Sequence, residues 1–281
     1  LYYLKEIIDK FYYMKNGRII DCKTNQEFFE NEAENKSKGL RSLKLENIVP
    51  TGERIIGSNR LEIKELSFSY RETKIFQNIN YSFSSGNIYG IAGNNGVGKS
   101  TLGKILSGIL DCKSGKVIYN KKPLSKNKRR KQIYYLSNNP DSNLFGVSAQ
   151  EELELNCKNC DVEAILENYN LAEFKNTHPQ ILSGGQKQRL TIAQSELLDR
   201  DVYILDEPTS GLDAKNMEII ANRIKEFQAK DKIILIISHD YELLMKICTD
   251  ICWLNRDNIL SLDPKTQRDL ILKLLMKGES V

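Results

Sequence analysis

Short apolar runs alternate with helical stretches from about residue 60 onward. Residues 61–70 alternate apolar and polar side chains, a period that is typical of a strand with one face in water. The runs 87–92, 202–205 and 233–237 lack this alternation, which predicts strands that are buried on both faces. Such strands form a parallel sheet covered by helices, so the sequence predicts an α/β fold.

The pattern also predicts helices that would cover this sheet. Apolar residues follow helical spacing over 149–170 and 190–198. Asp263 and Pro264 form a favoured N-cap and first helical position, so we expect a closing helix from there through Leu275. The chain would thus end on a helix of the same α/β domain.

Residues 1–58 do not continue this pattern. The segment 25–57 is polar and charged with few apolar positions, and we expect a linker there. Residues 4–19 also resemble residues 245–260 at an offset of 241 positions, as a faint internal repeat of one helix end and one strand. The matches are Lys5 with Lys246, Asp9 with Asp250, and Tyr12 with Trp253.

Length and composition place the chain among ordinary globular proteins. Its 281 residues correspond to one or two domains, and 40% of them are hydrophobic and 28% charged. The longest apolar run, 233–237, is far shorter than the roughly 18–20 residues of a membrane span, so the chain is not expected to cross a membrane by itself. The first residues lack the order of a signal peptide, and we expect a cytoplasmic protein.

The six cysteines are too few for a disulfide framework in a chain of this length. Cys157 and Cys160 form one close pair, and Cys248 and Cys252 form another, which leaves a four-thiolate zinc site formally open. No feature of the sequence brings the two pairs together. We therefore expect four ordinary thiols.

A glycine-rich motif follows the predicted strand 87–92. Residues 93–101 match G-x4-G-K-[ST] and lead into a helical stretch. Glycines let backbone N–H groups surround a polyphosphate at a helix N-terminus, Lys99 supplies a positive charge to the β- and γ-phosphates, and the Ser100 hydroxyl can bind Mg²⁺. The residues expected to contact ATP here are Asn94, Asn95, Gly96, Val97, Gly98, Lys99, Ser100 and Thr101.

Two carboxylates end the predicted strand 202–205. A buried parallel strand delivers Asp206 to its C-terminal edge, where open α/β sheets bind ligands, so Asp206 can hold the Mg²⁺. Glu207 lies one residue further, clear of the metal, and can orient or deprotonate an attacking water. Without the Lys99 loop, the same pattern would indicate a strand that ends in a solvated acidic turn.

Further motifs stand in a recognisable order over residues 61–260. Residues 182–189 are Leu-Ser-Gly-Gly-Gln-Lys-Gln-Arg, and residues 206–213 are Asp-Glu-Pro-Thr-Ser-Gly-Leu-Asp. With the Lys99 loop, these segments resemble the P-loop, signature, Walker B and D-loop motifs of ATP-binding cassette (ABC) ATPases. By the same resemblance, His239 matches the switch histidine of that family, and Tyr70 falls where the family places the aromatic residue that stacks on adenine.

The resemblance implies a fold and an activity. The fold is that of P-loop NTPases of the ABC type, with a mostly parallel core sheet between helices, a small antiparallel β subdomain and an α-helical signature subdomain. The activity is ATP hydrolysis with Mg²⁺. The catalytic residues would be Lys99, Glu207 and His239.

The signature motif has a physical role of its own. It opens a predicted helix, which makes a second anion site of exposed N–H groups at a positive dipole end. In the family this site faces the γ-phosphate held by the P-loop of a partner cassette, so two cassettes close head-to-tail over two ATP molecules and catalysis requires a dimer. The residues expected at that contact are Ser183, Gly184, Gly185, Gln186 and Asp213.

One position departs from the family pattern. Residues 135–145 resemble the Q-loop of cobalt-type and other energy-coupling factor ATPases, in which a glutamine normally occupies the place of Asn138. Asparagine keeps the amide but is one methylene shorter. Either it reaches Mg²⁺ or the attacking water through an added water, or the site is slow. We expect reduced but real turnover.

A basic stretch covers residues 121–131. It contains no aromatic residue, and the net charge of the chain is only +4, so we expect a solvated loop and no nucleic-acid partner. Contact of this stretch with anionic lipid at a membrane surface stays open.

The resemblance also gives the faint internal repeat a cause. In an ABC cassette, residues 245–260 are the helix end and strand that follow the switch histidine. We therefore interpret residues 1–24 as the tail of a preceding ABC domain, 25–58 as the linker, and 59–281 as one ABC ATPase domain. An upstream copy would then place its own histidine just before Leu1.

A tandem arrangement with this Q-loop is most similar to fused energy-coupling factor transporter ATPases, which power uptake of vitamins and metal ions. The resemblance implies three partners: a second cassette, a transmembrane scaffold subunit and a substrate-binding membrane subunit. It also implies a location at the cytoplasmic face of the cell membrane. The transported substrate is not encoded in this chain.

Two alternatives stay open. One is the ATPase of another ABC importer or exporter, which the cassette motifs do not exclude. The other is a non-transport tandem ABC protein of the translation-factor type, although such proteins usually have a longer charged linker and Thr-Asn-His-Leu-Asp in place of residues 209–213. Repair and chromosome ATPases need a long insertion between the P-loop and the signature, for which this chain has no room.

Overall fold

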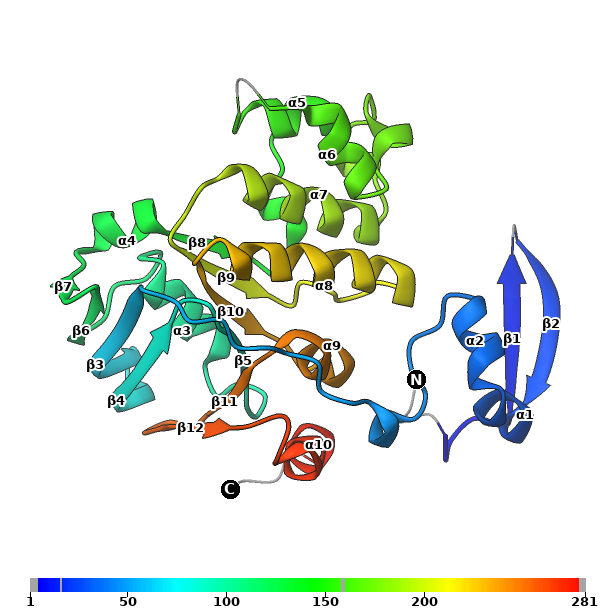
Figure 1. The fold of residues 1–281 in the computed structure, drawn as a ribbon, viewed down its shortest axis with the longest axis horizontal. Helices are drawn as coiled ribbons and strands as arrows, with labels where there is room; N and C mark the ends of the chain where they lie inside the picture. The colour runs from blue at the N-terminus through cyan, green and yellow to red at the C-terminus, as the bar shows by residue number, and fades with distance from the viewer. Residues whose placement is uncertain (1–4, 16, 158–159, 278–281) are drawn as a thin grey trace.

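The computed structural model describes residues 5–15, 17–157 and 160–277 (Figure 1). Within these residues the chain forms a six-stranded sheet, a four-stranded sheet and a two-stranded hairpin. The strands of the six-stranded sheet, in spatial order, are β12 (Ile259–Leu262), β11 (Asp250–Leu254), β5 (Ile88–Ala92), β10 (Ile233–Ile237), β9 (Val202–Asp206) and β8 (Ile133–Leu136). All neighbouring pairs are parallel except β11 with β12. The predicted parallel sheet is therefore confirmed.

The central strands are buried on both faces, as their unbroken apolar runs predict. In β10, Ile233, Leu235 and Ile237 contribute to one hydrophobic cluster, whereas Ile234 and Ile236 contribute to the other. This division follows the period of two residues along a strand. Each central strand therefore joins two cores, one on each face of the sheet.

The four-stranded antiparallel sheet covers one of these faces together with a helix. Its strands, in spatial order, are β4 (Thr73–Ser84), β3 (Arg60–Tyr70), β6 (Ser114–Tyr119) and β7 (Lys122–Pro123). Helix α3 (Lys99–Leu106) buries Leu102 and Ile105 in the same cluster as these strands. The P-loop thus lies between the two sheets.

The remaining helices cover the other face or extend away from it. They are α5 (Ala149–Glu154), α6 (Val162–Asn168), α7 (Gly184–Leu197), α8 (Ala214–Ala229), α9 (Tyr241–Ile247) and α10 (Arg268–Lys277). Helix α4 (Lys126–Gln132) lies beside α3 instead, because Arg129 donates to the carbonyl oxygen of Ile105 at 2.7 Å. Short 3-10 helices are η2 (Leu45–Asn47), η3 (Pro140–Asn143), η4 (Ala172–Phe174) and η5 (Pro179–Ile181). Helices α5, α6 and α7 form a separate helical part at the top of Figure 1. Across the described ranges, the helices are too short or too polar to span a membrane.

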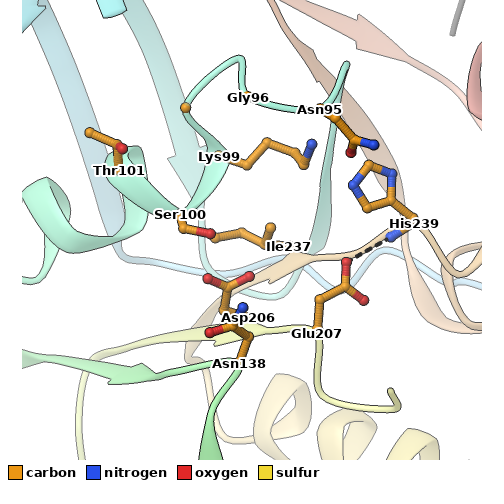
Figure 2. A pocket seen from close by; sticks show the side chains of 11 residues that line it. Asn95, Gly96, Lys99, Ser100, Thr101, Asn138, Asp206, Glu207, Ile237 and His239 are labelled. Carbon is orange, nitrogen blue, oxygen red and sulfur yellow. Dashed lines mark hydrogen bonds between the residues drawn. The ribbon is translucent and has the colours of Figure 1, made fainter. Parts of the chain in front are cut away.

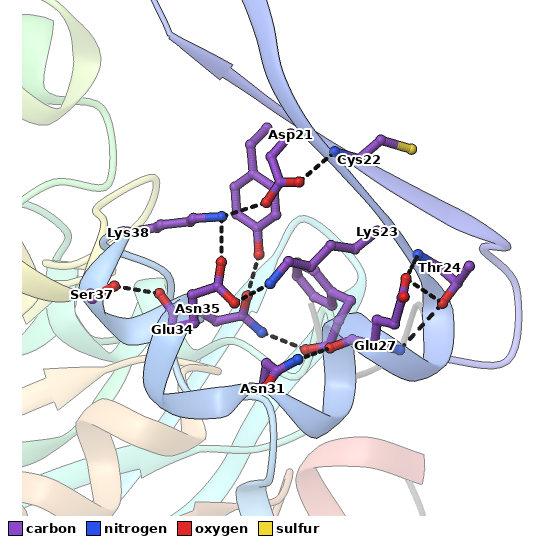
Figure 3. A network of polar contacts seen from close by, with 12 residues as sticks. Asp21, Cys22, Lys23, Thr24, Glu27, Asn31, Glu34, Asn35, Ser37 and Lys38 are labelled. Atoms are coloured by element: carbon purple, nitrogen blue, oxygen red, sulfur yellow. Dashed lines mark hydrogen bonds and ion pairs between the residues drawn. The ribbon is translucent and has the colours of Figure 1, made fainter.

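The N-terminal residues form a small module of their own. Strands β1 (Lys10–Lys15) and β2 (Arg18–Thr24) make a hairpin, and helices α1 (Asn25–Glu30) and α2 (Glu32–Ser37) follow it directly. Phe28 and Phe29 are buried against Phe11, which stacks on Phe28 with ring centroids 3.8 Å apart. Figure 3 shows the polar contacts that join the hairpin to α2, including that of Lys38 with Asp21 at 2.7 Å; Lys38 also pairs with Glu34 of α2 itself at 2.8 Å.

Three expectations for local structure are wrong in detail. The linker expected from residue 25 begins only after α2, because the two buried phenylalanines and the capping box of Thr24 with Glu27 support helices in a mostly polar stretch. The basic stretch is largely helix α4 instead of a loop, since Ser125 caps it and Arg129 is buried. Helix α10 starts at Arg268, because Asp263 caps a turn by accepting from the N–H of Lys265.

The segment expected as one helical stretch over 149–170 forms two helices, α5 and α6. Cys157 and Cys160 lie between them, whereas Cys248 and Cys252 are buried at the end of α9 and in β11. Among the described residues, no three His, Cys, Asp or Glu side chains gather as metal ligands.

Candidate nucleotide-binding site

The P-loop, two strand ends and the Q-loop meet around one cavity of about 340 Å³ (Figure 2). The P-loop joins β5 to α3, Asp206 and Glu207 follow from β9, and His239 follows β10. The residues that line the cavity are Asn95, Gly96, Gly98, Lys99, Ser100, Thr101, Asn138, Asp206, Glu207, Ile237 and His239. Most of the P-loop residues expected from the sequence, and all those expected to act in catalysis or hold Mg²⁺, therefore lie together.

The P-loop conformation requires glycine. Gly96 and Gly98 have φ angles of +77° and +108°, a region that residues with a side chain rarely adopt. A Cβ on Gly98 would also lie 2.5 Å from Cγ2 of Ile75. The loop thus packs closely against β4 before α3 begins, and the N-terminus of α3 presents its N–H groups to the cavity.

Lys99 is the cation of the site. Its side-chain ammonium group donates to the carbonyl oxygens of Gly93 at 2.8 Å and Asn94 at 3.0 Å, and the residue is 9% exposed. Burial lowers the pKa of Lys99, while Glu207 and Asp206 oppose part of the shift. A buried ammonium at a helix N-terminus is well suited to a polyphosphate.

The residues expected to hold Mg²⁺ fit that ion. Ser100, Asp206 and Asn138 line one cavity and offer a hydroxyl, a carboxylate and an amide oxygen, which are the hard oxygen ligands that Mg²⁺ prefers. Asp206 is only 2% exposed. Asn138 is exposed on the Q-loop, so its amide can turn toward the cavity.

Tyr135 is a site residue that the sequence reasoning missed. Its hydroxyl donates to Oδ2 of Asp206 at 2.7 Å. Burial raises the pKa of Tyr135, so the phenol keeps its proton and can donate. Gly103 leaves the space for the ring, because a Cβ there would lie 2.7 Å from Cε2 of Tyr135. In the sequence, this role is indicated only by the position of the tyrosine, three residues before Asn138. The structure adds that its strand is adjacent to the strand that ends at Asp206.

Glu207 has a strained backbone that sets its carboxylate apart from Asp206. Its φ is +52°, unusual for a residue with a long side chain, and such strain concentrates at functional sites. Oε2 accepts from the Ser238 hydroxyl at 3.0 Å, and Oε1 accepts from the backbone N–H of His239 at 3.2 Å. Burial raises the pKa of Glu207, and these two hydrogen bonds oppose part of the rise. A carboxylate with a raised pKa is suited to general-base chemistry.

His239 extends over the same cavity from the end of β10. Its ring lies near the amino group of Lys99 (Figure 2), and its side chain is more exposed than the carboxylate of Asp206. Burial, with a smaller contribution from Lys99, lowers the pKa of His239, so the neutral ring is favoured. A neutral imidazole can donate one hydrogen bond to a phosphate oxygen.

The signature residues lie outside this cavity. Ser183 caps α7 through a capping box with Gln186, and Gly184 and Gly185 form the first turn. These residues line a second cavity of about 610 Å³ together with the loop that contains Asp213, and Asn138 borders both cavities. Asp213 caps α8 by accepting from the N–H of Asn216. The N-terminus of α7 therefore opens onto this second cavity, and the signature residues do not line the cavity of the P-loop.

Tyr70, Asn94 and Val97 do not line the main cavity. Tyr70 ends β3 with 45% of its surface exposed, and its ring packs edge-on against Phe68. Tyr70 pairs with Thr73 of β4 at one end of the antiparallel sheet. Ile75, on the same strand as Thr73, contacts Gly98 of the P-loop. This position is compatible with an adenine ring beside the P-loop.

A profile of the family described as ABC transporter matches residues 76–210. A putative ABC transporter ATP-binding protein of Listeria monocytogenes is 32% identical over 228 residues, which cover 76% of this chain and 85% of that protein. The chain belongs to the ABC transporter ATP-binding proteins. The P-loop, Walker B and signature motifs of this ABC chain occupy the positions described above, and proteins of this family hydrolyse ATP.

Other relatives are longer than this ABC chain. A putative ABC transporter ATP-binding protein of Treponema denticola is 32% identical over 271 residues, 92% of this chain and 55% of that protein. The putative HMP/thiamine import ATP-binding protein YkoD of Bacillus subtilis is 34% identical over 208 residues, 69% of this chain and 36% of that protein. The chain therefore spans about half the length or less of these relatives.

The solved structures support the same fold. The structure of cbiO1 from Clostridium perfringens, part of the ABC transporter complex cbiONQ, matches with a TM-score of 0.62 and 28% identity over 78% of this chain and 96% of that one. The ABC ATPase fold expected from the sequence is thus confirmed, with its mostly parallel sheet, antiparallel sheet and helical part.

Proposed function

We propose that this chain binds and hydrolyses ATP to power membrane transport, as part of an energy-coupling factor type importer of vitamins or metal ions. The observation that carries the ATPase proposal is the convergence of Lys99, Asp206, Glu207 and His239 on one cavity. The second anion site at Ser183 supports catalysis between two cassettes.

The geometry supports a division of roles. Lys99 and the N–H groups of the P-loop bind the β- and γ-phosphates. Ser100, Asp206 and Asn138 would hold the Mg²⁺, which neutralises phosphate charge when bound. Glu207 accepts the proton of the water that attacks the γ-phosphorus, and His239 donates a hydrogen bond to a γ-phosphate oxygen. Tyr70 would stack on adenine.

A partner cassette completes the site. Its residues equivalent to Ser183, Gly184, Gly185, Gln186 and Asp213 would contact the γ-phosphate bound to the Lys99 loop of this chain. The lining of the two cavities in one chain supports this arrangement, because they share only Asn138 and the signature does not line the cavity of its own P-loop. Loss of the γ-phosphate would weaken the contact and so produce motion.

Two observations support a role in membrane transport: similarity to transporter proteins, and an exposed apolar surface beside Phe145. YkoD is named as a putative HMP/thiamine import ATP-binding protein, and cbiO1 is described as part of the ABC transporter complex cbiONQ. After the Q-loop, Phe145 and Val147 are 79% and 69% exposed. The buried carboxylate of Glu152 holds this loop by accepting from the N–H groups of Phe145 at 2.6 Å and Gly146 at 2.5 Å. Apolar side chains on an anchored loop are suited to docking a membrane subunit.

The proposal places the chain at the cytoplasmic face of the cell membrane. The full-length protein should co-purify in detergent with the membrane subunits encoded beside its gene. Phe145→Asp should abolish this association and Ile56→Asp should retain it, because Ile56 is equally apolar and fully exposed but lies far along the chain from the Q-loop. Association that survives Phe145→Asp would contradict this docking surface. Co-purification with ribosomes instead would favour the translation-factor class.

We further propose that residues 1–58 are the tail and linker of a preceding cassette. The hairpin β1–β2 followed by helices repeats the order of β11–β12 followed by α10. Strand β11 pairs with β5 and is buried on both faces, whereas the N-terminal hairpin leaves apolar residues in water. The exposed members are Tyr12 (58%), Met14 (67%), Ile19 (61%) and Ile20 (58%). A preceding cassette would cover them.

The gene itself tests this arrangement. The encoded residues immediately before Leu1 should resemble Ser-His-Asp and should follow a complete P-loop cassette; a start methionine there would contradict it. In the protein with that cassette, backbone amides of β1 should exchange with solvent more slowly than in residues 1–281 alone. Equal exchange rates would argue against a buried hairpin.

A further inference from the structure

One arginine in the segment between α2 and η2 binds the loop beside the catalytic residues. Nη2 of Arg41 lies 2.7 and 2.6 Å from the two carboxylate oxygens of Asp240, and its Nε donates to Oε2 of Glu242 at 2.7 Å. About one fifth of each of these three side chains is exposed. Arg41 lies 199 positions before Asp240 in the sequence, so this fork connects two distant parts of the chain.

Asp240 connects this arginine to the catalytic carboxylate. It follows His239, and its backbone N–H donates to the Ser238 hydroxyl at 3.1 Å, while that hydroxyl donates to Glu207 at 3.0 Å. Oδ1 of Asp240 caps α9 by accepting from the N–H of Leu243. The orientation of Asp240 therefore fixes the start of α9 and the direction of the loop that contains His239.

The same carboxylate also holds the loop after Glu207. The Thr209 hydroxyl donates to Oδ2 of Asp240 at 2.9 Å. At the other end of that loop, the N–H of Ala214 donates to the carbonyl oxygen of Gly39 at 3.0 Å. Ala214 follows Asp213 and is the first residue of α8. Residues 39–42 thus contact two loops, the one between Glu207 and α8 and the one that contains His239 and Asp240.

We propose that Arg41 is a positioning residue for ATP hydrolysis, which couples the N-terminal module to the loops that contain Thr209 and His239. The inference rests on the proposed ATPase function. While Arg41 is bonded to Asp240, Asp240 holds the loops that contain Thr209 and His239 in place beside Glu207. Arg41 itself does not line the nucleotide cavity, so its effect should be on turnover and not on ATP binding.

The chain offers a matched control. Arg54 lies after η2, in the segment that connects α2 to β3, and pairs with Asp250 at 2.7 Å. This arginine is 57% exposed, and its partner begins β11, away from both loops. Arg54→Gln therefore removes an ion pair between the connecting segment and the cassette without touching the site.

The test is steady-state ATP hydrolysis by the full chain and its Arg41→Gln, Arg41→Lys and Arg54→Gln variants. Arg41→Gln should lower kcat by about tenfold with KM for ATP within about twofold of the parent, the pattern of an interaction that acts on the transition state. Arg41→Lys should fall in between, because an ammonium does not reproduce the planar fork. Arg54→Gln should keep kcat within about twofold of the parent.

Hydrogen exchange gives a second readout that does not depend on turnover. Amides of residues 209–214 should exchange faster in Arg41→Gln and at the parent rate in Arg54→Gln. If the Gln variant of Arg41 does not fold, the Lys variant decides the question by the same two measurements.

The outcomes separate the two proposals. Equal kcat values for the Arg41 and Arg54 variants, or a rise of KM without a fall of kcat, would overturn the positioning role. No hydrolysis by the parent chain, alone or with its partner cassette, would overturn the proposed function. If the amides of residues 209–214 exchange at the same rate in Arg41→Gln and in the parent, the positioning role is overturned, even when the parent chain does not hydrolyse ATP.

Discussion

Removal of the Tyr135 hydroxyl should destabilise the protein through Asp206. Tyr135→Phe keeps the ring in the space beside Gly103 but removes the donor that lies 2.7 Å from the Asp206 carboxylate. Asp206 is 2% exposed, so water does not replace that donor without local opening. A hydrogen bond to a buried charged group contributes roughly 1.5–3 kcal/mol, and we expect a loss of about 2 kcal/mol in the free energy of unfolding.

The adjacent tyrosine supplies the control. The hydroxyl of Tyr134 is buried and has no hydrogen-bond partner among the residues that the structure describes. Tyr134→Phe removes an unsatisfied polar group, and it should leave the free energy of unfolding unchanged or raise it by up to about 1 kcal/mol. The two variants delete the same atom type on neighbouring residues of one strand, with opposite expected signs.

The assay is thermal unfolding of the three proteins in a buffer without nucleotide or Mg²⁺. For a domain of 150–250 residues, 1 kcal/mol corresponds to about 2–4 °C, so Tyr135→Phe should lower Tm by about 4–8 °C. Tyr134→Phe should melt at or above the parent temperature. A Tyr135→Phe protein that melts with the parent, or equal losses in both variants, would refute the assignment of that hydrogen bond as a support of Asp206.

Three further predictions concern the nucleotide site. Lys99→Ala should abolish ATP binding or hydrolysis, measured by nucleotide titration and phosphate release, because the variant lacks the buried cation; binding and turnover at parent levels would contradict its role. Glu207→Gln should keep ATP binding and accumulate a closed dimer on size-exclusion chromatography, since the amide does not accept the proton; rapid turnover would remove Glu207 from that role. Asn138→Gln should raise the rate of hydrolysis by restoring the missing methylene, and an unchanged or lower rate in a phosphate-release assay would count against the argument from reach.

Motifs predicted the local structure around the cavity because each motif is a short continuous segment. The P-loop needs a strand, glycines at positive φ and a helix in direct succession, and residues 93–101 contain all of these in order. Asp206 was placed correctly because it ends a strand that is buried on both faces. Strand bounds were predicted closely for the same reason, as an uninterrupted apolar run has few other structures available to it.

Contacts between distant segments were not predictable from these patterns. Tyr135 reaches Asp206 only because β8 and β9 are neighbours and Gly103 lacks a side chain. Arg41 meets Asp240 across most of the chain, and its neighbours in sequence do not indicate that partner. The helices α1 and α2 depend on two phenylalanines that pack against a hairpin, which composition averaged over the segment conceals.

The internal repeat expected at an offset of 241 does not match the faces of the two strands in the structure. At the offset of 241, Tyr12 aligns with Trp253, but Trp253 shares a core with Ile271 of α10, whereas Tyr12 is 58% exposed. Tyr13, one position later, does face its helix, with its ring centroid 6.0 Å from that of Phe28. An offset of 240 therefore aligns residues that face the same side of each hairpin. A shift of one residue aligns residues that face opposite sides, because successive side chains of a strand point to opposite faces.

With the faces aligned, the two hairpins differ mainly in what covers them. Strand β11 has Cys252 and Leu254 buried against the four-stranded sheet, and it gains β5 as a neighbour. On the N-terminal hairpin, Tyr12 points away from the helices and Met14 is 67% exposed. Burial of such side chains contributes roughly 25 cal/mol per Å² of apolar surface, so this face gains stability when a sheet covers it. A preceding cassette would supply that sheet, and the closed Arg41 fork would then transmit its movement to the loops around Glu207.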